Sequence, residues 1–125
     1  PGGGVTLVNL AENLKATGEE SFVAGHNLLK RALEQPFRIL MSNSGLNADE
    51  WLPQVKKGKA GQGVDVNNPS KLVDLKTAGV VDPARVTKEA LQNAVSIAGT
   101  AMTMGALVVE VPEVKSAGGD MGGMM

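Results

Sequence analysis

The sequence contains no cysteine and no tyrosine, and its only aromatic residues are two phenylalanines and one tryptophan. The absence of cysteine excludes a disulfide framework, a thiolate nucleophile and a cysteine-based zinc site, and it is compatible with a reducing compartment. With so few aromatic side chains, a core has to be built from Ala, Val, Leu, Ile and Met. Such a composition favours closely packed helices.

Neither sign of charge is in excess, because 12 basic residues face 13 acidic ones and the net charge is −1. This balance gives no reason to expect binding to nucleic acid or to an anionic membrane. The single histidine, His26, has no nearby carboxylate or serine pattern that would form a triad, and a histidine-based metal site has nothing to build on. These patterns predict no catalytic residue and no metal ligand.

The chain begins at Pro1, without an initiator methionine or a signal-peptide pattern, and we expect it to be a fragment of a longer chain. From Ala90 to Val109 there is no charged residue, over about the length of a membrane span. This stretch is rich in alanine and contains several polar residues and glycines. We interpret it as a helix that is buried on most sides in a soluble protein, rather than as a membrane span.

Apolar residues recur at helical spacing in the first third of the chain. They predict a helix over residues 5–14 and a second helix that starts near Glu19. Pro36 is expected to end that second helix, because proline fits a first turn but not a helix interior. A third helix is then expected from Phe37, with Gly45 as its C-terminal stop.

Asn47 resembles a helix N-cap, and it precedes a short predicted helix that carries Trp51. The following residues 56–63, with three lysines, are predicted to form a flexible polar loop. Residues 64–69 indicate a strand end and a turn. Asp82 and Pro83 form a second helix start, for a helix that should run to about Gly105. Residues 107–111 alternate like a strand, and the Gly- and Met-rich remainder over 113–125 is predicted to be a disordered tail.

Two features leave a choice between a structural and a functional interpretation. The run from Gly2 to Gly4 before a helix is either a simple loop or a place where the backbone closely approaches a phosphate or a sugar. Asp82 is either the cap of its helix or an acceptor of hydrogen bonds from sugar hydroxyls. The patterns alone favour the loop and the cap, and they predict a mainly α-helical chain without indicating what it does.

Several segments, taken in order, resemble the group I chaperonins, the GroEL-like 60 kDa chaperonin family. The segment Pro1-Gly-Gly-Gly-Val5 is similar to the point where a chaperonin chain returns to its equatorial domain. The segment Ala32-Leu-Glu-Gln-Pro-Phe-Arg38 resembles a second family motif, and Gly79-Val-Val-Asp-Pro-Ala-Arg-Val-Thr-Lys88 resembles a third. The end Gly119-Asp-Met-Gly-Gly-Met-Met125 is similar to the Gly-Gly-Met tail of the family. The resemblance covers essentially the whole chain.

The resemblance implies that residues 1–112 are the C-terminal portion of an equatorial domain, which binds ATP and makes ring contacts. This portion is expected to be mainly α-helical, with a short β-hairpin and a C-terminal strand. Gly3 would match the glycine whose backbone lies against the nucleoside, and Asp82 would match the aspartate that accepts the ribose hydroxyls. Asp65, Val66 and Asn67 would match the loop that covers the adenine. The family's phosphate loop and its magnesium-binding carboxylates have no counterpart in this sequence. Because phosphate and metal charges supply most of phosphoryl-transfer catalysis, this chain alone is expected to be inactive although its parent is an ATPase.

The resemblance also implies partners and a place of action. The expected partners are identical subunits in a double ring, a co-chaperonin lid and unfolded client proteins, and neither nucleic acid nor a membrane is expected as a partner. The expected place of action is the cytoplasm. A rival hypothesis is a free-standing helical oligomerisation module that uses the same helix faces for assembly and has no nucleotide function.

Overall fold

The computed structural model describes residues 1–106 and 108 and divides the chain into two compact units, residues 1–89 and the residues from Ala90 onward. The predicted strand over 107–111 and the predicted tail over 113–125 lie outside the described residues, apart from the isolated residue 108.

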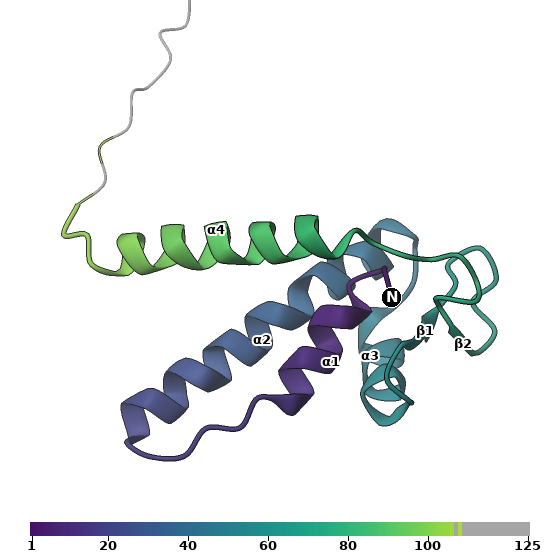
Figure 1. Cartoon of the computed structure of the whole chain (residues 1–125), viewed down its shortest axis with the longest axis horizontal. Coiled ribbons are helices and arrows are strands. Elements are labelled where there is room, and N and C mark those ends of the chain that lie inside the picture. The colour runs from purple at the N-terminus through teal and green to yellow at the C-terminus, as the bar shows by residue number, and fades with distance from the viewer. Residues whose placement is uncertain (107, 109–125) are drawn as a thin grey trace, which may run out of the picture. The chain divides into compact units, whose positions relative to one another are not determined.

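The described residues form four helices and one antiparallel pair of strands (Figure 1). In chain order the elements are α1 (Val5–Asn13), α2 (Glu20–Asn43), α3 (Ala48–Lys57), β1 (Gln62–Val64), β2 (Leu72–Asp74) and α4 (Ala84–Met102). In the hairpin, Gln62 pairs with Asp74 and Val64 with Leu72. This arrangement confirms the prediction of a mainly helical chain with a short β-hairpin.

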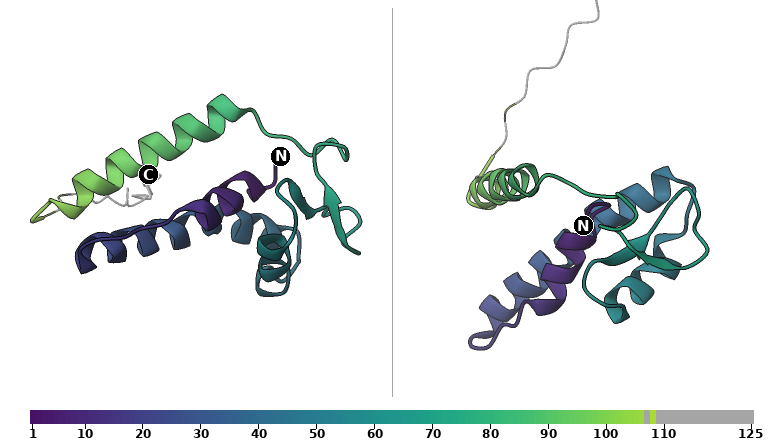
Figure 2. Two further views of the ribbon diagram at one scale, coloured as in Figure 1. Left: turned by 60° about the horizontal axis from the view of Figure 1, so that its bottom comes forward. Right: turned by 45° about the vertical axis from the view of Figure 1, so that its right-hand side comes forward.

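The core of the first unit lies where α1, α2 and α3 meet the hairpin. α1 runs alongside α2 (Figure 2), and α3 packs against both helices. The buried apolar side chains come from all of these elements and from the turn after β2: Val5, Val8, Phe37, Met41, Trp51, Leu52, Val55, Val64 and Leu75. Only the C-terminal half of α2 contributes buried side chains to this cluster. The N-terminal half of that helix is largely exposed.

The prediction that Pro36 separates two helices is wrong, because α2 continues through it from Glu20 to Asn43. Leu33, Phe37 and Met41 form one buried stripe across the proline. Pro36 itself is exposed, so the backbone carbonyl that lacks its hydrogen-bond donor is on the side that water can reach. Packing of the buried stripe therefore outweighs the local cost of the proline.

The predicted stop at Gly45 and the predicted cap at Asn47 are both confirmed. Gly45 has φ +74°, and the Leu46 N–H donates to the Met41 carbonyl at 2.8 Å, which is the pattern of a Schellman motif. The Asn47 side chain accepts from the Asp49 N–H at 3.0 Å and so caps α3. These two adjacent caps fix the turn between α2 and α3.

The prediction of a flexible loop from Lys56 is wrong at its start, since α3 extends through Lys57. The Lys56 ammonium is not surrounded by water alone, because it forms ion pairs with Glu34 of α2 and Glu12 of α1. The sequence pattern could not predict these ion pairs, because the two acids are distant in sequence and become neighbours only when the three helices pack.

α4 differs from its predicted environment. In the described structure no residue of α4 is buried, so the expectation of a helix buried on most sides is not met. Among the described residues of the second unit, no second layer covers the apolar side chains of α4, such as Val95 and Ile97. Within the described ranges, no helix combines the length and the apolar character needed to cross a membrane.

Candidate functional site

The glycine run at the N-terminus forms a tight turn that leads into α1. Gly3 and Gly4 have φ values of +64° and +76°, in the left-handed region that favours glycine. The Val5 N–H donates to the Gly2 carbonyl at 3.2 Å, and the Gly2 N–H donates to the Val80 carbonyl at 2.9 Å. No heavy atom of the described chain lies within 4 Å of where a Cβ of Gly3 would be. One side of the turn is therefore open to an approaching ligand.

Asp82 lies directly beside this turn. A Cβ built on Gly2 would be 3.1 Å from the Asp82 Oδ1 and 3.0 Å from the Val81 carbonyl carbon, so only glycine fits there without a shift. Asp82 is exposed, and within the described part of the chain its carboxylate makes no hydrogen bond. The Pro83 carbonyl accepts from the Thr87 N–H at 3.2 Å as α4 begins, but the Asp82 carboxylate does not bond to that helix. Its oxygens remain available as acceptors.

The loop over residues 65–67 is held by its own hydrogen bonds. The Asp65 Oδ1 accepts from the Asn67 N–H at 3.0 Å, and the Asp65 carbonyl accepts from the Asn68 N–H at 3.0 Å. Val66 and Asn67 are exposed. No hydrogen bond among residues 1–106 joins this loop to Gly3 or Asp82. The structure thus places Asp82 beside the glycine turn, while the described contacts leave the 65–67 loop apart from them.

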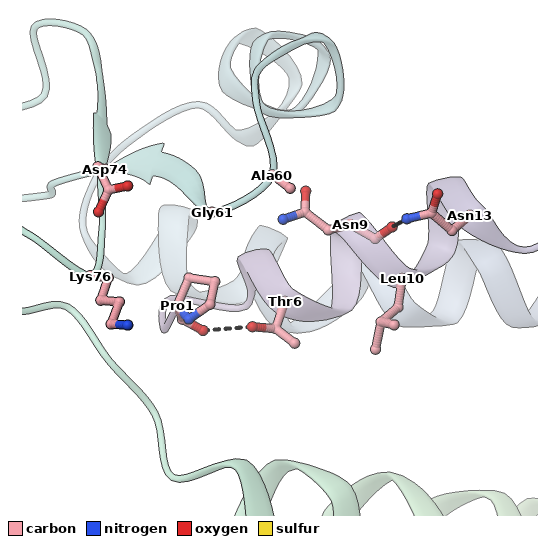
Figure 3. A pocket seen from close by; sticks show the side chains of 9 residues that line it. All are labelled: Pro1, Thr6, Asn9, Leu10, Asn13, Ala60, Gly61, Asp74 and Lys76. Carbon is pink, nitrogen blue, oxygen red and sulfur yellow. Dashed lines mark hydrogen bonds between the residues drawn. The ribbon is translucent and has the colours of Figure 1, made fainter.

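A cavity of about 400 Å³ opens elsewhere on the first unit, and none of the five candidate residues lines it. Figure 3 shows Thr6, Asn9, Leu10 and Asn13 of α1 on one side, and the turn before β1 together with residues near the end of β2 on the other. The remaining lining residues are Pro1, Ala60, Gly61, Asp74 and Lys76. The spacing of Thr6, Asn9 and Asn13 places them on one face of α1 and could have been recognised in the sequence. The approach of residues 60–61 and 74–76 could not.

The cavity has a weakly polar lining. The Thr6 hydroxyl donates to the Pro1 carbonyl at 2.7 Å, and the Asn13 side-chain amide donates to the Asn9 carbonyl at 2.9 Å. The Asp74 Oδ1 accepts from the Thr77 N–H at 2.8 Å. Across the described residues, no group of three or more His, Cys, Asp or Glu side chains is arranged to hold a metal ion.

The hydrogen bond from the Thr77 backbone N–H, followed by that from its hydroxyl, lowers the pKa of Asp74 below its ordinary value of 3.8. Because the folded pKa is the lower one, the stabilisation is present above pH 3.8 and is lost as the pH falls through the folded pKa. We expect an NMR titration of the Asp74 carboxyl carbon to have its midpoint below 3.8. The wild-type chain should also lose more stability below pH 3.8 than Asp74→Asn does. A midpoint at or above 3.8 would contradict this.

Comparison with known protein families gives one match over most of the chain. The model of the TCP-1/cpn60 chaperonin family matches residues 1–112. The match includes the glycine turn, the hairpin and Asp82, and it extends through all four helices.

Proposed function

This chain belongs to the TCP-1/cpn60 chaperonin family of protein-folding chaperones, and from that membership we propose that it is the C-terminal part of a group I equatorial domain that forms the nucleoside-facing wall of an ATP site. The observation that carries the proposal is the position of Asp82 against the glycine turn. The Asp82 carboxylate has no hydrogen-bond partner in the described chain. Its Oδ1 lies 3.1 Å from the position that a Cβ of Gly2 would take, so it is directly beside a backbone that has no side chains.

The chemistry of this juxtaposition suits a ribose. A carboxylate has acceptors for the hydrogen bonds that neighbouring hydroxyls donate. The missing side chain at Gly3 lets a flat ligand lie close to the backbone. Asp65, Val66 and Asn67 are proposed to cover the adenine. In this proposal the groups that bind the phosphates and magnesium come from elsewhere in the protein, so this chain alone does not hydrolyse ATP.

The rest of the proposal concerns assembly. We propose that the helices contribute contacts between identical subunits of a double ring, and that the complete protein works in the cytoplasm with a co-chaperonin lid and unfolded clients. The support for ring contacts is the large apolar side chains that the described structure leaves exposed on α2, among them Leu28 at 62% and Ile39 at 57% exposure. In this proposal a neighbouring subunit of the ring covers these side chains.

An NMR titration of the 125-residue chain with millimolar ATP tests the nucleoside site at the level of single residues. We expect the amide signals of Gly3, Asp82 and Asn67 to shift. The shifts should be smaller with 2′-deoxy-ATP, because one hydroxyl that donates to Asp82 is missing. In Asp82→Ala the two nucleotides should behave alike. Helix content should be retained in this variant, since the carboxylate makes no bond to α4.

Asp74→Asn is the matched control, because Asp74 lies in the cavity and not at the proposed site. This variant should keep the ATP-dependent shifts of the wild-type chain. If ATP instead shifts Asn9 and Gly61, and Asp74→Asn removes those shifts, the nucleoside site has been assigned to the wrong place. If no amide shifts at any concentration, the rival hypothesis of a helical interaction module without nucleotide function is favoured.

A further inference from the structure

Three helices of the first unit meet around one ammonium group. The Lys56 Nζ of α3 lies 2.5 Å from the Glu34 Oε1 of α2 and 3.2 Å from the Glu12 Oε1 of α1. These acids are far apart in sequence and belong to different helices. A single lysine therefore joins the end of α3 to both of the other helices.

Glu34 is the most enclosed member of this group, with 13% of its side chain exposed. A carboxylate in such a position needs a close partner, because its charge has lost much of its hydration. Arg38 does not replace Lys56 in this role: its Nε is 3.9 Å from the Glu34 Oε2, and its closer contact is with Asp49 at 2.5 Å. The hydrogen bond with Glu34 is also the main cause that raises the pKa of Lys56 above 10.5.

The position of Lys56 in α3 gives the contact a mechanical consequence. Val55 is the last buried residue of the helix. The helix is followed by a turn over residues 58–61, the α3–β1 turn. A Cβ on Gly58 would lie 3.1 Å from the Leu72 Cδ1, so this turn lies directly against β2. The Leu75 N–H also donates to the Gly61 carbonyl at 3.2 Å. The end of α3 is therefore connected to the hairpin through this turn.

We propose that Lys56 is a positioning residue: by pairing with Glu34 and Glu12 it fixes the α3–β1 turn, and with it the hairpin whose loop contains residues 65–67. The proposal rests on the proposed function only for the role of that loop at the adenine. The positioning itself concerns this chain without nucleotide. Ala60 and Gly61 of the same turn form a wall of the cavity in Figure 3.

Amide hydrogen exchange of the nucleotide-free chain tests this proposal. The readouts are the amides of Gly58, Gln62 and Leu75, which donate to the carbonyls of Gln54, Lys59 and Gly61. In Lys56→Met these amides should exchange about fivefold faster, as expected for a lost, partly exposed ion pair. The amides of buried residues in α1 and α2 should keep their wild-type rates.

Three further arms separate positioning from general stabilisation. Lys57→Met, which removes the neighbouring exposed lysine, should leave all rates unchanged. Lys56→Arg should restore the wild-type rates, because it keeps the charge. Added salt should speed exchange at the three amides in the wild-type chain and not in Lys56→Met. Should Lys56→Met unfold the chain, Glu12→Gln removes only the longer contact and should give a smaller, equally local acceleration.

Unchanged exchange at the three amides in a folded Lys56→Met chain would overturn the proposal. So would an acceleration of equal size at every amide of the first unit, which would make Lys56 a general stabiliser. Neither result bears on the ATP titration, in which the variants at Asp82 and Asp74 decide the outcome.

Discussion

Replacing Gly4 by alanine should destabilise the first unit by about 3 kcal/mol. Gly4 has φ +76°, a conformation that costs a residue with a Cβ about 1–2 kcal/mol. The new methyl group would also lie 2.7 Å from the Phe37 backbone N and 2.9 Å from its Cα. Backbone atoms in the middle of α2 cannot move aside easily, so α1 would have to shift, at a further cost of about 1–3 kcal/mol.

Gly45→Ala is the matched control for the steric part of this effect. Gly45 has nearly the same φ, +74°, but no described heavy atom lies within 4 Å of its Cβ position. Its substitution should therefore cost about 1 kcal/mol, for the backbone conformation alone. Urea denaturation followed by Trp51 fluorescence measures both variants, because this single tryptophan is 8% exposed in the core. Equal losses in the two variants would show that Gly4 is not constrained by the contact with α2.

The helix boundaries set by local chemistry could be predicted from the sequence. Asn47 and Gly45 act on backbone groups within a few residues, so the pattern contains all the necessary information. The same local rule fails at Pro36, where the packing of Leu33 and Phe37 decides the outcome. The break was predicted from the proline alone, and the helix continues because the buried stripe runs through it.

The candidate site also depends on contacts between residues that are distant in sequence. No periodicity indicates that Asp82 lies beside Gly2, because the two are at opposite ends of the first unit in sequence; only the family resemblance suggested a common site. The three-helix contact of Lys56 was missed altogether, since a lysine-rich stretch predicts a solvated loop when its partners are unknown. The contacts of the 65–67 loop with a ligand remain a prediction.

The core should depend on Phe37 more than on any other single side chain of α2. Phe37 has no exposed surface, and it belongs to the cluster that joins α1, α3 and the hairpin. Phe37→Ala should lower the free energy of unfolding by about 3–5 kcal/mol, from lost burial and from the cavity left behind. A domain of this size has about 5–15 kcal/mol in total. This one substitution therefore removes a large part of its stability.

Phe22→Ala separates burial from helix propensity, because it makes the same chemical change in the same helix. Both variants gain the same small preference of alanine for helix. Phe22 is 56% exposed, and its ring lies near the His26 ring, at a centroid distance of 4.7 Å. Its loss should cost about 0.5 kcal/mol. Both midpoints can be measured in urea through Trp51. If Phe22→Ala costs as much as Phe37→Ala, the exposed half of α2 is packed against another surface in solution, and the stability of α2 does not reside in its C-terminal half alone.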